Sequence, residues 1–429
     1  MSKPARGPQS AAVVAIGDEV LRGEVANGNA TWLAAQLAQM GFEVREHAVV
    51  SDDPKAIRAV LTRLKKDIDV LVVTGGLGPT EDDRTIDVVC ELLDVQAEPH
   101  EASLAAMKKR FSAHGFEMTP NNLRQVRVPK GAEALPNAAG IAPGFRAKLE
   151  KTDAFFMPGV PREAERIFAD HVLGRLTKIM DKAGVPPPAV RTWHVYGMGE
   201  SHIDHRLAGL LEGVSGATLH FRTAHPENHV KVVVRAADTA KAKETLARLD
   251  AEVRKRIGQG IYGIDDDTFP KAVGRALREE KATLTLAESC TGGYAGELIT
   301  AEPGASDFFL GSLVAYNNDV KVSALGVKAA TIQEYGAVSE PCAKEMAEGA
   351  KKLTGATVAV AITGLAGSSK DGDAPTPAPA GEKPVGTVCF ALAGPKSTKT
   401  SSKFFTGGRE RIRRAAAYFA LDMARRQFM

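Results

Sequence analysis

The 429-residue chain has few cysteines, and the four that it has (Cys90, Cys290, Cys342 and Cys389) form no CxxC pair. This spacing predicts neither a disulfide framework nor a zinc site, and it favours a reducing compartment. The chain also has no window of about 18 apolar residues that could span a membrane. Its first ten residues, MSKPARGPQS, do not contain the apolar core of a signal peptide. We therefore expect a cytoplasmic protein with no membrane partner.

The chain also has no large excess of positive or negative charge. Lys and Arg number 55 and Asp and Glu 52, which gives a formal net charge of +3. So small an excess does not by itself predict a polyanionic partner. The segment 213–216, GVSG, matches the GXXG loop of RNA-binding KH modules, but neither of its central residues is basic. We do not expect nucleic acid to be the main ligand.

What the chain does have is length and an ordinary globular composition, 44% hydrophobic and 25% charged. At about 150 residues per domain, this length indicates about three domains. We place them at 10–182, 189–262 and 267–429. The segment GVPPP at 184–188 is the clearest linker. In the first and last regions short apolar runs alternate with helical periodicity, which predicts α/β domains with largely parallel sheets; the middle region reads as a small α+β unit.

Two polar turns in the first region follow predicted strands. GDE (17–19) ends the run 11–16, and TGGLGPTEDD (74–83) ends the run 69–74. Ligands of parallel sheets bind beyond the carboxyl ends of the strands, so both turns can converge on one cleft. Glycines at a helix start suit a phosphate, and Asp82 and Asp83 could hold a divalent cation such as Mg²⁺ that bridges phosphates. The alternative is an ordinary turn whose aspartates cap a helix. Arg162 could meet a phosphate or simply lie at the surface.

The most distinctive stretch runs from 286 to 321, LAESCTGGYAGELITAEPGASDFFLGSLVAYNNDVK. A predicted strand ends in the turn that contains Ser289 and Thr291, and a helix follows. Such a turn directs backbone N–H groups at an anion. A second turn contains Ser306, and Lys321 is expected on the strand that returns from it. A serine paired with a lysine is a known alternative to the Ser–His pair.

These motifs resemble the CinA family of competence- and damage-inducible proteins over essentially the full length. AESCTGG, PGAS, AYNNDVK, GAVSE, ITGLAG and KPVGTV are similar to the family's nicotinamide-nucleotide amidohydrolase domain. GDEVLRG, NGN and TGGLGPTEDD are similar to the MoaB/MogA-like molybdopterin-binding domain. The middle region resembles the family's KH-type domain. The resemblance implies a three-layer αβα first domain, a KH-like middle domain, an α/β amidohydrolase domain and a homodimer.

For function, the resemblance implies hydrolysis of nicotinamide mononucleotide to nicotinate mononucleotide and ammonia. This activity belongs to pyridine-nucleotide salvage and needs no cofactor. The resemblance also implies that the first domain is a metal-dependent ADP-ribose pyrophosphatase. The alternative is a nucleotide- or nucleic-acid-binding protein of competence or the DNA-damage response. In the family's pattern the nucleophile is the second serine of the Pro-Gly-Ser-Ser turn, here Ser306, and the first serine is replaced by Ala305.

Three residues compete as nucleophile: Ser289, Cys290 and Ser306. Cys290 has no histidine near it in sequence, so we favour Ser306 with Lys321 as general base. Tyr316 orients the pair or relays a proton, and Arg409 is the candidate for the phosphate. Backbone N–H groups at the glycine turns would steady the oxyanion or the phosphate. The substrate-binding set is Ser289, Thr291, Gly292, Gly293, Asn318, Thr363, Gly364 and Arg409.

The nucleotide set of the first domain combines the two turns with matching motif positions: Gly17, Asp18, Glu19, Asn29, Thr74, Gly75, Gly76, Gly78, Thr80 and Arg162, with Asp82 and Asp83 as metal ligands. Two positions depart from the family's pattern, because Gly28 and Ile141 stand where threonine is usual. A Pro/Ala/Gly-rich insert, 368–383, lengthens the loop after ITGLAG, and its composition predicts a mobile segment that cannot build a core.

Overall fold

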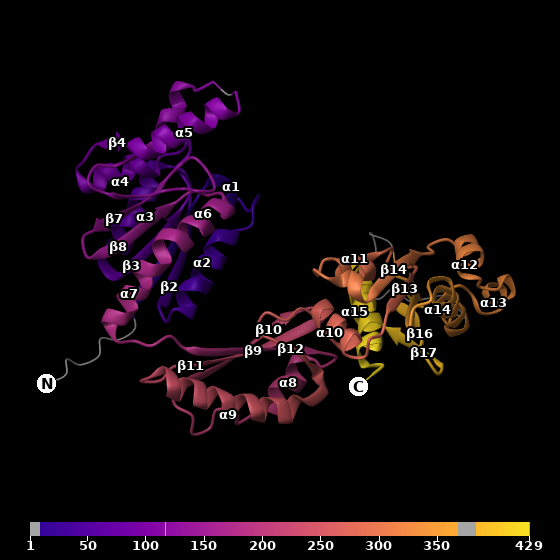
Figure 1. The fold of residues 1–429 in the computed structure, drawn as a ribbon. Helices are drawn as coiled ribbons and strands as arrows, with labels where there is room; N and C mark the ends of the chain where they lie inside the picture. The colour runs from indigo at the N-terminus through magenta and orange to yellow at the C-terminus, as the bar shows by residue number, and fades with distance from the viewer. Residues whose placement is uncertain (1–8, 116, 368–382, 429) are drawn as a thin grey trace. The chain divides into compact units, whose positions relative to one another are not determined.

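The computed structural model describes residues 9–115, 117–367 and 383–428. The insert lies outside these residues apart from its last member, Lys383. The chain divides into two compact units, one made of 1–190 with 233–246 and the other of 191–232 with 247–429. Mixed α/β architecture is observed throughout, as expected (Figure 1).

The first unit is built on a six-stranded sheet of order β2-β1-β3-β8-β7-β6. Its strands are β1 (Ser10–Ile16), β2 (Glu43–Val50), β3 (Val70–Thr74), β6 (Glu133–Leu135), β7 (Gly144–Leu149) and β8 (Thr152–Met157). The first four strands in that order are parallel, whereas β7 and β6 join antiparallel. β1, β3 and β8 are buried along their whole length, which is why they read as continuous apolar runs.

Helices cover both faces of this sheet. α3 (Pro54–Asp67) and α4 (Thr85–Leu93) pack on one face, and α2 (Gly28–Gln39), α6 (Pro161–Ile167) and α7 (Leu173–Ala183) pack on the other. A π-helical turn, Phe168–Val172, separates α6 from α7. Three further helical segments were not predicted from the sequence: α1 (Asp18–Leu21), α5 (Glu101–Ala113) and the 3-10 helix Pro120–Val126.

The second unit begins with a four-stranded sheet of order β10-β11-β9-β12. Its strands are β9 (Ala189–Tyr196), β10 (Ala217–Ala224), β11 (Glu227–Val234) and β12 (Ile261–Ile264). Its helices are α8 (Glu200–Leu207) and α9 (Thr239–Ile257), although the end of β11 and the start of α9 belong to the first unit. This is the small α+β domain expected for the middle of the chain.

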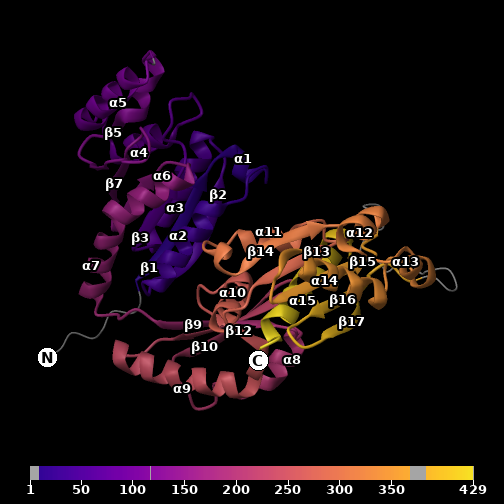
Figure 2. The ribbon, with the colours of Figure 1, turned by 45° about the vertical axis from the view of Figure 1, so that its right-hand side comes forward.

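A five-stranded sheet of order β14-β13-β15-β16-β17 forms the rest of the second unit. Its strands are β13 (Leu284–Glu288), β14 (Phe309–Val314), β15 (Val358–Gly364), β16 (Thr387–Ala393) and β17 (Thr398–Phe404). β14, β13 and β15 are parallel. α10 (Phe269–Glu279), α11 (Tyr294–Thr300) and α15 (Arg409–Arg426) pack on one face and α14 (Glu340–Thr354) on the other (Figure 2).

One expectation about this sheet is wrong. Lys321 does not lie on the returning strand, as expected, but in the helix α12 (Asn318–Leu325). The side chain of Asn317 caps this helix by accepting a hydrogen bond from the Asp319 N–H over 2.8 Å. The segment therefore turns into a helix directly after β14. A further helix, α13 (Ala329–Tyr335), precedes α14.

Candidate active site and nucleotide pocket

The carboxyl ends of β13 and β15 and the residues after β14 enclose a cavity of about 210 Å³. The lining residues are Ser289, Cys290, Tyr316, Asn318, Lys321, Ala337, Val338, Thr363, Gly364, Ala366 and Arg409. Seven of these were expected at the site: Ser289, Tyr316, Asn318, Lys321, Thr363, Gly364 and Arg409. They come from four separate parts of the chain, and the parallel strands bring them to one edge of the sheet.

Lys321 is the unusual member of this set, because its side chain is only 2% exposed. Its Nζ donates a hydrogen bond to the backbone carbonyl oxygen of Tyr316 over 3.2 Å. Burial lowers the pKa of the Lys321 ammonium, because desolvation disfavours the charged form. A lysine with a lowered pKa that lines a cavity is a candidate for proton transfer.

Tyr316 and Arg409 meet across the mouth of this cavity. The Arg409 guanidinium donates one hydrogen bond to the Tyr316 hydroxyl over 2.9 Å and another to the Gly367 carbonyl oxygen. Arg409 is the first residue of α15, which fixes the origin of its side chain. The guanidinium has five N–H donors, so it can bond these two protein oxygens and an anionic ligand at the same time.

The Cys290 thiol lines the cavity but is in the wrong protonation state for a nucleophile. Burial raises the pKa of Cys290 to about 12, so the thiol keeps its proton at neutral pH. All four cysteines are free and buried.

Glu288 organises the glycine turn, and the sequence analysis did not identify it. Its fully buried carboxylate accepts hydrogen bonds from the Gly293, Ala295 and Gly296 N–H groups over 3.0, 3.0 and 2.8 Å. The Ser312 hydroxyl donates a fourth over 2.7 Å. A carboxylate here neutralises the amino end of α11. The sequence signal was an acidic residue at the end of an apolar strand, directly before a glycine turn.

These bonds correct one expectation. We expected backbone N–H groups at Gly292 and Gly293 to face a ligand, but the Gly293 N–H is bound to Glu288 and the Gly292 N–H to the Ser289 carbonyl oxygen. Gly293 has a φ of 96°, so glycine is required by the backbone conformation. Neither glycine lines the cavity, and neither does the fully buried Thr291.

Ser306 does not line the cavity either. It lies in the 3-10 turn Ala305–Asp307, which precedes β14, whereas the cavity lies beyond the other end of that strand. The Leu284 N–H at the start of β13 bonds the Phe308 carbonyl oxygen, and the Ala315 N–H bonds the Glu288 carbonyl oxygen at its end. Four residue steps of β13 separate these two bonds, which is about 13 Å. Ser306 and Lys321 of one chain therefore cannot be in hydrogen-bond contact.

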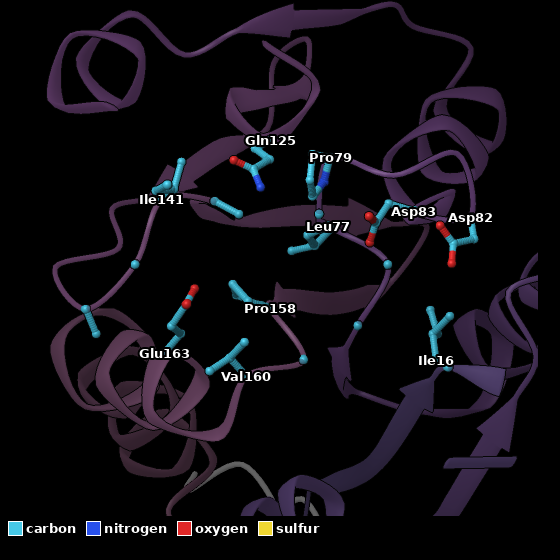
Figure 3. Close-up of a pocket in the computed structure, with 18 of the residues that line it drawn as sticks. Ile16, Leu77, Pro79, Asp82, Asp83, Gln125, Ile141, Pro158, Val160 and Glu163 are labelled. Atoms are coloured by element: carbon cyan, nitrogen blue, oxygen red, sulfur yellow. The ribbon is translucent and has the colours of Figure 1, made fainter. Parts of the chain in front are cut away.

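The first unit has a larger pocket, about 880 Å³, at the carboxyl ends of β1 and β3 (Figure 3). Of the residues expected there, Gly17, Glu19, Gly75, Gly76, Gly78, Asp82 and Asp83 line it. The φ of Gly75 is 103°, and a Cβ at this position would lie 2.0 Å from the Ile16 carbonyl oxygen. Glycine at this position therefore lets the two turns approach each other.

Five other expected residues do not line this pocket. The Asp18 carboxylate pairs with Arg22, and the Asn29 amide donates to the Gly159 carbonyl oxygen over 2.7 Å. Thr74 is buried in β3, Thr80 bonds Asp83, and Arg162 is exposed at the start of α6. Residues that the sequence analysis missed take part instead: Asp52, Arg110, Gln125 and Glu163. They come from β2–α3, α5, the 3-10 helix and α6, and no local motif links them to the glycine turn.

Both aspartates interact with Thr80, and the hydrogen bond to Thr80 lowers the pKa of the Asp82 carboxyl. Asp83 Oδ2 accepts hydrogen bonds from the Thr80 N–H and hydroxyl over 2.9 and 2.5 Å, so one carboxylate oxygen holds its own turn. Within the described ranges, no group of three His, Cys, Asp or Glu side chains is arranged to hold a metal ion. Two carboxylates fit a Mg²⁺ ion only where a ligand's phosphate oxygens and water complete the shell.

The fold and the two sites define a three-domain α/β protein, with a nucleotide-sized pocket at one sheet edge and a buried lysine at another. Three family models match it: the probable molybdopterin binding domain over 12–178, the damage-inducible protein CinA KH domain over 190–263 and the CinA C-terminal domain over 266–428. The chain belongs to the CinA family.

Full-length relatives agree. A competence-damage inducible protein of Symbiobacterium thermophilum is 41% identical, covering 98% of this chain and 99% of that protein. A CinA-like protein of Desulfosudis oleivorans is 38% identical, covering 98% of this chain and all of that protein. Among solved structures, a CinA superfamily protein of Klebsiella pneumoniae is 32% identical, covering 37% of this chain and 95% of that chain with a TM-score of 0.34. No described helix is long and apolar enough to cross a membrane.

Proposed function

We propose that the last domain hydrolyses the carboxamide of nicotinamide mononucleotide, giving nicotinate mononucleotide and ammonia in cytoplasmic pyridine-nucleotide salvage. The observation that carries this proposal is the buried Lys321, whose Nζ lies at a cavity of about 210 Å³ beside Tyr316 and Arg409. A lysine with a lowered pKa can act as a base near neutral pH, and no cofactor is needed for amide hydrolysis of this kind.

The reaction has two halves. The serine Oγ attacks the carboxamide carbon while neutral Lys321 takes the hydroxyl proton. In the tetrahedral intermediate the Lys321 ammonium donates its proton to the amide nitrogen, the C–N bond breaks, and ammonia leaves a nicotinoyl ester on the serine. Water attacks this ester while neutral Lys321 takes a proton from the water. The acyl–oxygen bond then breaks, the Lys321 ammonium returns the proton to the serine Oγ, and nicotinate mononucleotide leaves as the acid, which ionises to its carboxylate.

Ser306 is the proposed nucleophile, on the resemblance of its turn, although it does not contact Lys321 of its own chain. Ser289 is the alternative because it lines the cavity. Cys290 is the weakest of the three candidates, since its pKa of about 12 leaves it protonated. Arg409 would bind the substrate phosphate while Tyr316 holds the guanidinium in place. Asn318, at the start of α12, and Thr363 would contact the ribose or the carboxamide.

A second activity is proposed for the first domain: metal-dependent cleavage of the diphosphate of ADP-ribose. The observation that favours it is a pocket of about 880 Å³ in which a glycine turn meets Asp82 and Asp83. A divalent ion bound there would supply charge neutralisation and polarisation of a phosphoryl oxygen. The alternative is that this pocket binds nucleotides without cleaving them.

Ammonia release from nicotinamide mononucleotide by the purified full-length protein tests the main proposal. We expect equimolar ammonia and nicotinate mononucleotide without added metal and in the presence of EDTA. No ammonia from the wild-type protein would refute the proposal. It would leave the nucleotide- or nucleic-acid-binding alternative, which equilibrium binding of ADP-ribose and of short DNA would then address.

A further inference from the structure

The edge strand β14 presents an open, apolar face. Among the described residues, β14 has β13 as its only neighbour in the sheet. Large apolar side chains on β14 and on the segment after it are exposed: Leu310 (47%), Val314 (47%), Tyr316 (60%), Val320 (39%) and Val322 (37%). An unpaired apolar edge offers backbone N–H and C=O groups to another strand, and a surface of this kind commonly marks an interface.

The same strand separates the two halves of the proposed catalytic pair. Ser306 precedes its first residue, and Tyr316 and Lys321 follow its last. Within one chain the two ends are about 13 Å apart. Ser306 is exposed and so is free to meet another surface, whereas Lys321 is held in the cavity.

We propose that a second copy of this chain pairs with β14 across a two-fold axis, so that Ser306 of each copy completes the Lys321 cavity of the other. This inference rests on the proposed function, because it takes Ser306 and Lys321 to be partners. Two-fold pairing of identical strands is antiparallel, and it brings the start of one strand to the end of the other. Such a dimer would explain both the unpaired edge of β14 and the separation of Ser306 from Lys321 within one chain.

The register supports this arrangement. Full antiparallel overlap of Phe309–Val314 with its own copy pairs Phe309 with Val314 and Gly311 with Ser312. Continued past the strand ends, the same register sets Ser306 opposite Asn317 of the second copy. Asn317 lies between Tyr316 and Asn318, both of which line the cavity.

The Lys321 amine lies next to the Tyr316–Asn318 segment. Its Nζ is hydrogen-bonded to the Tyr316 backbone carbonyl oxygen at 3.2 Å, so it sits beside the backbone that the incoming serine faces. A serine arriving from the second copy would therefore approach the buried Lys321 amine, the proposed base. Pairing would also cover Leu310 and Val314, which are otherwise left in water.

A heterodimer of two inactive chains tests the proposal. Ser306→Ala and Lys321→Met chains with different tags are co-expressed, and the mixed dimer is isolated by both tags in turn. Each homodimer is expected to be inactive. In the mixed dimer, one site has the intact Ser306 of one copy and the intact Lys321 of the other, while the second site lacks both. We therefore expect about half of the wild-type turnover per dimer.

The outcomes separate the inference from the proposed function. An inactive mixed dimer, with both homodimers folded and inactive, would show that the pair forms within one chain and would overturn the inference alone. An active Ser306→Ala protein would overturn the role of Ser306 and the inference with it, but would leave amide hydrolysis in place. A wild-type protein that releases no ammonia would refute the proposed function itself.

The edge itself can be tested independently. Leu310→Lys puts a charge on the exposed face of β14 without touching the cavity. We expect this variant to be monomeric by light scattering and to lose at least 90% of its turnover. The matched control is Phe404→Lys, which places the same charge at an exposed apolar residue of β17, the opposite edge strand, and should stay dimeric and active. A Leu310→Lys monomer with full activity would exclude the arrangement.

Discussion

The Arg409 guanidinium donates a hydrogen bond to the Tyr316 hydroxyl over 2.9 Å, joining residues 93 positions apart in the sequence. Arg409 begins the last helix, and Tyr316 follows the edge strand of the sheet. Both line the same cavity as Lys321. The pair therefore lies between the proposed phosphate site and the proposed base. Phosphate binding by Arg409 and proton transfer by Lys321 involve different side chains, so mutation can test the two roles separately.

Arg409→Lys should weaken substrate binding. Lysine keeps the charge but loses the planar fork that reaches the Tyr316 hydroxyl, the Gly367 carbonyl oxygen and a phosphate together. We expect KM to rise by about 10- to 100-fold, the loss of one or two charge-assisted hydrogen bonds, with kcat nearly unchanged. Steady-state kinetics of ammonia release measures both constants. A fall in kcat at constant KM would instead place Arg409 in the chemical step.

Tyr316→Phe distinguishes orientation from proton relay. If the hydroxyl only holds Arg409, its loss should raise KM in the same direction as Arg409→Lys and leave the pH profile unchanged. If the hydroxyl relays a proton, kcat should fall and the profile should change shape. We expect the first result, because the contact in the structure is with Arg409. The control is Tyr335→Phe, at an exposed tyrosine that does not line the cavity.

Turnover should rise with pH as Lys321 loses its proton. Burial lowers the pKa of this lysine, so the midpoint should lie below the value of about 10.4 for a free lysine. Lys321→Arg should lose nearly all turnover, because arginine keeps its proton.

Lys321→Met should also be inactive, yet its melting temperature should rise at neutral pH, since the cost of burying an ammonium is removed. This stabilisation should shrink above the pKa of Lys321, where the wild-type amine is neutral. Calorimetry at two pH values measures the difference, and a lower melting temperature for Lys321→Met would contradict it.

The sequence alone predicted most of the buried strands, because residues such as Val70–Thr74 and Val358–Gly364 have no polar face. The helix predicted after the Ser289 turn is present as Tyr294–Thr300. The seven cavity residues were predicted from polar motifs together with the resemblance to the CinA family. The start of α12 was missed because Asn317 resembles a turn residue when its role as a helix cap is not considered.

Contacts between residues far apart in the sequence could not be predicted from the sequence. Glu288 binds Ser312 and the amino end of α11 together, and nothing in one stretch of sequence indicates this convergence. Arg110 and Glu163 reach the first domain's pocket from helices that follow the glycine turn by many residues. The position of Ser306 relative to Lys321 depends on which end of β14 each occupies, and the turn motif does not show that.

Glu288→Gln should destabilise the last domain strongly. The glutamine amide keeps one acceptor oxygen, and its NH₂ group would face N–H donors that are now bound to a carboxylate oxygen. Losing charge-assisted bonds at a fully buried site costs about 2–4 kcal/mol. Glu297→Gln in the same helix is the matched control, because Glu297 is exposed and should change stability by less than about 0.5 kcal/mol. Urea unfolding of both variants measures the difference, and equal stability would show that the turn does not depend on this carboxylate.

Replacing Asp82 and Asp83 with Asn should affect the first domain alone. If these carboxylates hold the bridging cation, the double variant should lose Mg²⁺-dependent cleavage of ADP-ribose by at least 100-fold and keep full ammonia release from nicotinamide mononucleotide. Asp83 also holds its own turn through Thr80, so the single variant Asp82→Asn separates the two roles: it removes a pocket carboxylate and keeps the two hydrogen bonds from Thr80 to Asp83. Exposed Asp94→Asn, after α4, is a charge-matched control outside the pocket. If the wild-type protein cleaves ADP-ribose with no divalent ion, or if Asp82→Asn cleaves as well as wild type, the aspartate pair is a turn-capping device and the metal assignment is wrong.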